Sequence, residues 1–352
     1  MVSTLREVLK LTVINVVDNE SDNLSSPCQC CDPSSTDNPV MFYSDDIKRI
    51  VGAGGGSHID FDFDQMCYAA HGLSLLLIAE YIDDNGEIQE EHLLFDAGPD
   101  GNVWKHNATK LQLDLSKINT TVLSHYHPDH SGGYRSAVQE ISKARISGEP
   151  LLVVDYHSSQ IVERAFQNPK TGDLIKFVPN NPSVQELTEW GATVELHDEP
   201  HNQGKDCFYV SGYIPRVTPY ETGLPFHFSK VDGAWIEDPD VRDERYLAVK
   251  LKGRGVVVFS ACSHAGIINV CKDALDKLKS EKLTAVIGGF HLAHRSTFKR
   301  IDETIRDLQE LAPDLILAGH CTGWRAKAKL VTTFEYNSQI LTVGGRYTFN
   351  SM

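Results

Sequence analysis

Short apolar runs recur along this chain of 352 residues, separated by polar or glycine-rich segments. Runs rich in Val, Ile and Leu are typical of buried strands, whereas apolar residues that repeat every three or four positions are typical of helices. The runs predict strands at 11–17, 73–81, 92–96, 120–124, 151–154, 246–251, 255–260, 284–287 and 315–317. The helical period predicts helices at about 133–144, 158–168, 267–280 and 297–311. This alternation predicts one layered α/β domain over residues 1–352.

Two segments lack a clear period. Residues 20–66 are rich in Ser, Asp, Pro and Gly, which predicts a long surface insertion. The insertion holds Cys28, Cys30 and Cys31, but no second Cys/His pair stands nearby to complete a tetrahedral zinc site, so exposed thiols are the favoured interpretation. Residues 197–240 are rich in Pro, Gly and aromatic residues and predict loops that border a site.

Four apolar runs stop at or just before a histidine, namely His125, His264, His291 and His320. In open α/β sheets, sites form beyond the carboxyl ends of the strands, so these side chains are expected to converge on one edge. Each one taken alone could be a hydrogen-bonded histidine at a strand end, equally so for His291, whereas the small residues beside His264 and His320 favour a functional role. His157 also follows a strand but is interpreted as structural. No chemical role is predicted for the histidines without a motif, namely His58, His92, His106, His197, His201, His227 and His294.

The segment His125-Tyr126-His127-Pro128-Asp129-His130 carries the strongest chemical signal. Three imidazoles and a carboxylate fall within six residues, directly after a predicted strand, and Gly132-Gly133 then suits a tight turn into a helix. Imidazole nitrogen and carboxylate oxygen are ligands that zinc accepts. A solvated histidine cluster would give the same letters, but the full spacing favours a metal centre.

Composition narrows the class of protein further. The net charge is −15 and no long Lys/Arg run is present, which speaks against a nucleic-acid binder. No apolar run approaches the ~20 residues that span a bilayer, so no membrane partner is expected. The N-terminal residues lack the apolar segment of a secretory signal, which predicts a cytoplasmic protein with reduced cysteines.

Several motifs together resemble the metallo-β-lactamase superfamily, whose defining motif is similar to His125–His130. The resemblance narrows to the branch of the dihydropterin-ribofuranosylaminobenzene phosphate synthases and related hydrolases. The motifs that carry it are Phe95-Asp96-Ala97-Gly98, His71-Gly72-Leu73-Ser74-Leu75, Gly212-Tyr213-Ile214-Pro215-Arg216, Cys262-Ser263-His264-Ala265-Gly266-Ile267, Gly288-Gly289-Phe290-His291-Leu292 and Gly319-His320-Cys321-Thr322-Gly323. The resemblance implies a four-layer αββα sandwich with an N-terminal loop insertion.

The resemblance also implies a set of metal ligands. By motif position, His125 and His127 would bind the first metal, and Asp129, His130 and His320 the second. The chain departs from the superfamily in two places. Cys262 stands where a bridging Asp is usual, and Asp243-Glu244-Arg245 occupies the region of a further histidine motif. His264 is the first candidate to replace the missing ligand and Cys262 the second, since a thiolate also binds zinc. One or two Zn²⁺ ions are expected, with Mn²⁺ or Fe as alternatives.

The implied activity is that of a metal-dependent hydrolase, which uses a metal-bound hydroxide on a cyclic amide, lactone or ester. Asp129 and His291 are the candidate catalytic residues, as proton acceptor and as oxyanion stabiliser or proton donor. Arg216 and Arg325 are either anion-binding residues or surface charges. The partner is a small-molecule substrate, and the oligomeric state stays open.

Two alternative functions stay open. The first is synthase-type transfer on a phosphorylated pterin precursor. It is disfavoured by Tyr213, which replaces the Glu of the branch's Gly-Glu-Ile-Pro-Arg motif. The second is a metal-binding redox or sensing protein, suggested by the cysteines.

Overall fold

The computed structural model describes residues 4–22, 66–146 and 148–352. Most strands join one large sheet of fourteen strands. Its main path runs β17 (Ser338–Ile340), β16 (Leu315–Gly319), β15 (Leu283–Gly289), β14 (Gly255–Ser260), β13 (Leu247–Leu251), β1 (Glu7–Val17), β2 (Ser74–Ile82), β3 (Ile88–Phe95), β4 (Ile118–Val122), β5 (Leu152–His157) and β8 (Ala192–His197). β18 (Arg346–Asn350) pairs with β1, and β9 (His201–Gln203) and β10 (Phe208–Val210) extend from β13.

The sheet is folded on itself into two halves. β1 pairs with β13 only at Glu7 and Val8, so the joint between the halves is short. Buried residues of both halves, such as Phe95 of β3 and Val257 of β14, share one apolar cluster between them. Successive residues of a strand face opposite sides, so Leu94 and Val258 instead pack outward against helices.

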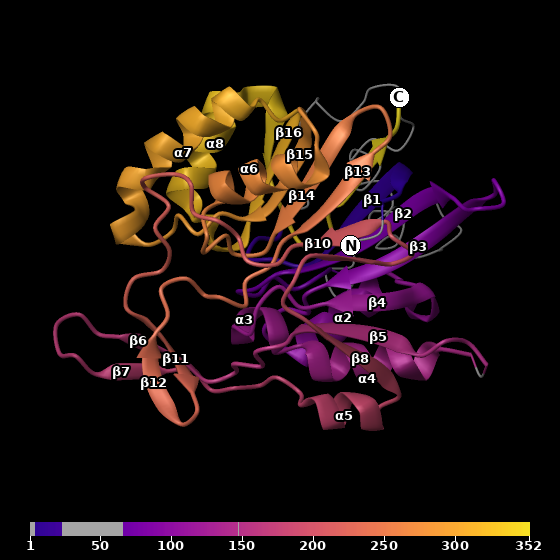
Figure 1. The fold of residues 1–352 in the computed structure, drawn as a ribbon, viewed down its shortest axis with the longest axis horizontal. Helices are drawn as coiled ribbons and strands as arrows, with labels where there is room; N and C mark the ends of the chain where they lie inside the picture. Colours follow the sequence, from indigo (N-terminus) through magenta and orange to yellow (C-terminus); the bar gives the residue numbers. More distant parts are fainter. Residues whose placement is uncertain (1–3, 23–65, 147) are drawn as a thin grey trace, which may run out of the picture.

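Helices cover both outer faces of the folded sheet (Figure 1). One set covers the half that contains β14, namely α6 (Ile267–Leu278), α7 (Phe298–Leu311) and α8 (Trp324–Phe334). The other set covers the half that contains β3, namely α2 (Gly101–Lys110), α4 (Tyr134–Ala144) and α5 (Val184–Glu189). Three apolar clusters therefore separate four layers, which confirms the predicted αββα arrangement. No helix in the described ranges is both long and apolar enough to cross a membrane.

A second, four-stranded sheet extends from this body (Figure 1). It consists of β12 (Ala234–Glu237), β11 (His227–Val231), β6 (Arg164–Gln167) and β7 (Leu174–Lys176). The predicted helix at 158–168 is therefore wrong, because β6 pairs with β11 and its Arg164 is buried against Asp238 and Asp243. Tertiary pairing overrides the weak local helical pattern there.

The predicted loops at 197–240 are only partly loops, because β9, β10, β11 and β12 lie within them. These strands have three to five residues each, too few for a clear period. The predicted insertion at 20–66 falls mostly on residues 23–65, outside the described residues, and so do Cys28, Cys30 and Cys31.

Candidate metal centre

The four strand-end histidines lie at one edge of the sheet, beyond the carboxyl ends of β4, β14, β15 and β16. The parallel register aligns the ends of β14, β15 and β16, since Ser260 pairs with Gly288 and Gly289 with Gly319. The rings of His264 and His291 consequently lie 4.4 Å apart, centroid to centroid. His125 reaches the same edge from β4 in the other half of the sheet, 4.9 Å from the His264 ring.

His125, His127 and His264 bring three ring nitrogens together. His125 Nε2 lies 3.0 Å from His127 Nδ1, and His264 Nε2 lies 3.2 Å from both. Zinc–nitrogen bonds of about 2.0–2.1 Å at tetrahedral angles place neighbouring donor nitrogens about 3.3 Å apart. The three nitrogens therefore have the spacing of ligands to one metal ion.

Hydrogen bonds behind two of these rings determine where their protons lie. Ser124 Oγ donates to Asp96 Oδ2, so it accepts from His125 Nδ1–H at 2.9 Å and leaves a lone pair on His125 Nε2. His227 Nδ1 donates to the carbonyl of Asp238 at 2.7 Å, so its Nε2 accepts from His127 Nε2–H. His127 Nδ1 then also carries a lone pair.

Two lone pairs that face each other at 3.0 Å, on His125 and His127, repel unless a cation lies between them. This arrangement of donors fits a metal ion. Burial also lowers the pKa of both rings, and that of His264, well below the usual value of imidazole. The rings are therefore neutral near pH 7, as metal ligation requires.

His227 is a functional candidate that the sequence did not predict. It lies on β11, one hundred residues beyond His127, and is fully buried at 3.0 Å from the His127 ring. The only sequence feature that pointed to it is its position within residues 197–240, the segment expected to border the site. Its hydrogen bond fixes the orientation of the His127 ring, as partners behind metal-binding histidines do.

Replacing His227 by alanine is expected to weaken metal binding by about 10- to 100-fold, the usual effect of losing such a partner. The His127 ring would then lose the acceptor that fixes its Nδ1 lone pair toward the metal. His227→Gln offers an amide oxygen as a replacement acceptor and should restore much of the affinity. Titration of chelator-treated protein with Co²⁺ measures the effect, and equal affinity of wild type and His227→Ala would contradict it.

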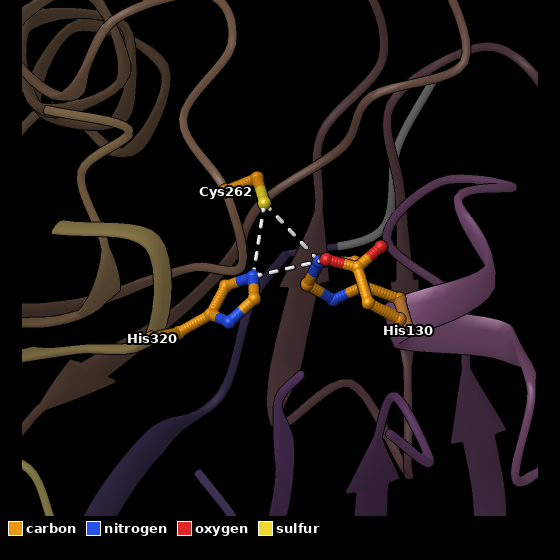
Figure 2. Close-up of side chains that lie close together, drawn as sticks. His130, Cys262 and His320 are labelled. Atoms are coloured by element: carbon orange, nitrogen blue, oxygen red, sulfur yellow. Dashed lines mark hydrogen bonds and ion pairs between the residues drawn. The ribbon is translucent and has the colours of Figure 1, made fainter. Parts of the chain in front are cut away.

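A second group of donors lies beside the first. Figure 2 shows Cys262 Sγ facing His130 Nε2 and His320 Nε2, each at 3.2 Å. Asp129 Oδ2 completes the group at 3.3 Å from His320 Nε2 and 3.6 Å from His130 Nε2. Two nitrogens, one oxygen and one sulfur therefore converge from three separate loops, as in a four-ligand zinc site.

Hydrogen bonds again direct the ring nitrogens of this second group. His130 Nδ1 donates to Asp96 Oδ2 at 2.7 Å, and His320 Nδ1 donates to Asn19 Oδ1 at 3.0 Å. Each ring therefore turns its Nε2 toward Cys262 and Asp129. Asp96 supports both groups, because it binds His130 directly and also accepts from Ser124, which in turn binds His125.

Cys262 is shared between the donor groups. It belongs to the group of Asp129, His130 and His320, and it also lies within ligand distance of His125 and His264. The structure thus brings both candidates for the missing ligand into the centre: His264 completes the first group, and Cys262 lies between the two groups. Burial raises the pKa of the Cys262 thiol, so its thiolate form needs a nearby cation.

Cys321 was not singled out from the sequence, yet it lies at the centre. Its Sγ is 3.4 Å from Cys262 Sγ, and it forms a further donor group with Cys262 and His291. The signal that could have found it is its position directly after His320 at the end of β16.

Asp243 and Glu244 occupy the region where a histidine motif was expected, and they position both ligand loops. Glu244 accepts from the backbone amides of His264 and Ala265, at 2.6 and 2.7 Å. Asp243 accepts from the amide of Tyr126 at 2.8 Å and pairs with Arg164.

The two carboxyls titrate differently because their partners differ. Burial would raise the pKa of Asp243, but Arg164 and its other neighbours lower it to about 2. Burial raises the pKa of Glu244 to about 7, against the effect of its two amide donors.

A cavity of about 390 Å³ opens onto the donor groups. Its lining residues are His71, His127, Pro128, Asp129, Phe166, Phe177, Cys262, His264, His291 and Cys321. Both predicted catalytic residues, Asp129 and His291, therefore face it. Neither predicted anion-binding arginine does: Arg216 pairs with Asp240, and exposed Arg325 lies over the Trp324 ring.

This geometry can be compared with known proteins. Residues 87–217 match the family model of the metallo-beta-lactamase superfamily, and this range includes the whole His125–His130 segment. The solved structure of Tm1679, described as a metal-dependent hydrolase of the beta-lactamase superfamily, superposes with a TM-score of 0.64. It is 20% identical, and the match covers 97% of this chain and 100% of that one. Residues 87–217 thus match a metallo-β-lactamase family model, and the chain has the metallo-β-lactamase fold.

The chain is also similar in sequence to a synthase. It is 27% identical over 280 residues to the 7,8-dihydropterin-6-methyl-4-(beta-D-ribofuranosyl)-aminobenzene-5'-phosphate synthase of Methanocaldococcus jannaschii. The match covers 79% of this chain and 89% of that protein. The branch resemblance seen in the sequence motifs is thereby confirmed.

Proposed function

We propose that this metallo-β-lactamase-fold protein is a metal-dependent hydrolase of an uncharged cyclic amide, lactone or ester. The observation that carries the proposal is the pair of donor groups that share Cys262 and open onto one cavity. Bound metal ions, most simply zinc, would lower the pKa of a coordinated water and polarise the scissile carbonyl. His125, His127 and His264 would hold one ion, and Asp129, His130, Cys262 and His320 the other.

Two side chains of the cavity are suited to moving protons. Asp129 lines the cavity, and if its Oδ2 held the second ion, its other carboxylate oxygen could accept a proton from the attacking water. His291 lines the cavity, where its ring would be placed to donate to the substrate oxygen or to the leaving group.

The lining of the cavity favours an uncharged, partly apolar substrate. Phe166 and Phe177 form an aromatic part of the lining, with their ring centroids 5.4 Å apart, and the Phe177 ring packs edge-on beside the His127 ring. No Lys or Arg lines the cavity within the described part of the chain. A substrate phosphate held away from the metal ions would need such side chains or a set of amide donors.

The alternative is synthase-type transfer on a phosphorylated pterin precursor. The synthase activity in the name of the Methanocaldococcus jannaschii relative, which is 27% identical, favours this alternative. The absence of cations from the described lining of the cavity speaks against it, and so does Tyr213 in the Gly212–Arg216 motif.

Purified protein with a full complement of metal is expected to hydrolyse apolar lactones or lactams. The Phe177→Ala variant should then show a KM raised about tenfold, with little change in kcat. Loss of an aromatic contact removes binding energy of about 1.4 kcal/mol, equivalent to a factor of ten, from both ground and transition state. Val178→Ala, at the exposed neighbouring position, is the matched control. Elemental analysis and a substrate panel provide the measurement. If the metal-loaded enzyme hydrolyses no uncharged lactone or lactam of the panel but converts a phosphorylated pterin, the synthase alternative is established.

A further inference from the structure

A second cluster of potential metal ligands lies outside the candidate metal centre, where β5, β8 and β9 meet. Asp155 pairs in register with Glu195 across β5 and β8, and His197 lies two residues further along the same face. His201 on β9 completes the group from the other half of the folded sheet. None of these residues was assigned a role from the sequence or used in the proposed hydrolysis.

The side chains of this cluster converge on one carboxylate oxygen. Asp155 Oδ2 lies 2.5 Å from His201 Nε2, 3.2 Å from His197 Nδ1 and 2.7 Å from Gln203 Nε2. The two imidazole rings stack with their centroids 3.8 Å apart. Asp155 itself is fully buried, with its other oxygen 2.5 Å from Arg245 Nη1.

The hydrogen bonds of His201 leave its Nε2 facing an acceptor. His201 Nδ1 lies 2.9 Å from the carbonyl of Glu199, which can only accept, so this nitrogen carries the proton. In the neutral ring, Nε2 then presents a lone pair to a carboxylate oxygen, which is also an acceptor. A positive charge must therefore accompany this pair. A second ring proton fits the 2.5 Å spacing as it stands, whereas a metal ion bound by both atoms needs them about 3.3 Å apart. A backbone carbonyl behind the ring is the usual partner of a metal-bound histidine.

We propose that Asp155, His197 and His201 bind a divalent transition-metal ion such as zinc. Two imidazoles and a carboxylate are a common zinc ligand set, with a fourth position left for water or for Glu195. Glu195 is close by, because its Oε2 accepts from Gln203 at 2.7 Å. The His197 side chain is 34% exposed and that of His201 is 15%, so an ion can reach the cluster from solvent.

An ion at this position would connect the two halves of the fold. Asp155 and His197 belong to the half that contains β4, whereas His201 lies on β9, which extends from β13 through β10. Those halves supply His125 and His264 respectively to the metal centre. The proposed ion would therefore have a structural role: it would link the two halves of the fold and so fix the relative positions of the loops that form the metal centre.

Zinc stoichiometry tests the proposal. Full-length protein is stripped with chelator, reloaded with Zn²⁺, freed of excess metal and analysed for zinc per folded chain. The test variant is the double substitution His197→Gln/His201→Gln, whose amides retain hydrogen-bonding capacity toward Asp155. The matched control is His294→Gln at an exposed histidine outside both clusters. Wild type and control are expected to hold one more zinc per chain than the double variant.

Equal zinc content in all three folded proteins would overturn the proposal and leave an imidazolium–carboxylate pair as the explanation. If the double variant does not fold, His201→Gln alone serves the same purpose, because it keeps His197 and Asp155. Its zinc affinity at this cluster should then be weaker than that of wild type by at least about tenfold. Unchanged affinity would again overturn the site, and neither result depends on whether the protein is a hydrolase.

Discussion

Replacing His127 by alanine is expected to abolish hydrolysis, with a loss of roughly 10³-fold or more in kcat/KM. Metal catalysis contributes several kcal/mol to transition-state stabilisation, and each 1.4 kcal/mol corresponds to about a factor of ten. His127 supplies one of three nitrogens spaced 3.0–3.2 Å apart, so its loss leaves an incomplete ligand set. Metal content and turnover should therefore fall together.

The measurement is elemental analysis together with kinetics on the best substrate of the panel, at equal concentrations of folded protein. His92→Ala is the control, because His92 is also a largely buried imidazole but lies on β3, away from the metal centre. It should retain activity despite some loss of stability. Turnover by His127→Ala at the wild-type rate would refute the assignment of the first donor group.

The sequence predicted the parts of the site that come from local spacing. The residues from His125 to His130 are close together in the chain, so the turn after β4 brings them to one place regardless of the distant fold. His264, His291 and His320 could be added because each follows a long apolar strand, and strand ends share an edge. The alternation of Leu and Val runs with amphipathic helices predicted a layered α/β domain, whereas the four-layer αββα order came from the motif resemblance.

Residues whose role depends on pairing between distant segments were missed. His227 reaches His127 only because β11 pairs with β6 in the small sheet, and neither strand has a readable period. Arg164 was predicted to be part of a helix. It is instead buried against Asp243, the carboxylate that also accepts from the backbone amide of Tyr126. Local propensity is a weak guide where a short strand is held by its partners.

Replacing Cys262 by alanine is expected to remove about one metal ion per chain and to lower kcat/KM by roughly 10²- to 10³-fold. Cys262 Sγ lies 3.2 Å from both His130 and His320 and is also within reach of the first donor group. Its loss should therefore leave the second ion with three weaker protein contacts and break the link between the groups. A thiolate ligand predicts a sulfur-to-metal charge-transfer band in the Co²⁺ protein, absent from the variant.

Two further variants separate ligation from packing. Cys262→Asp introduces the bridging carboxylate that is usual in the superfamily, so it should recover the second ion and part of the activity, without the thiolate band. Cys321→Ala removes the neighbouring thiol, 3.4 Å away, and should retain the ion if Cys262 alone is the shared ligand. If Cys262→Ala keeps both ions while Cys321→Ala loses one, the sulfur ligand is Cys321. The second donor group would then lie closer to His291, which would place His291 among the ligands rather than the proton donors.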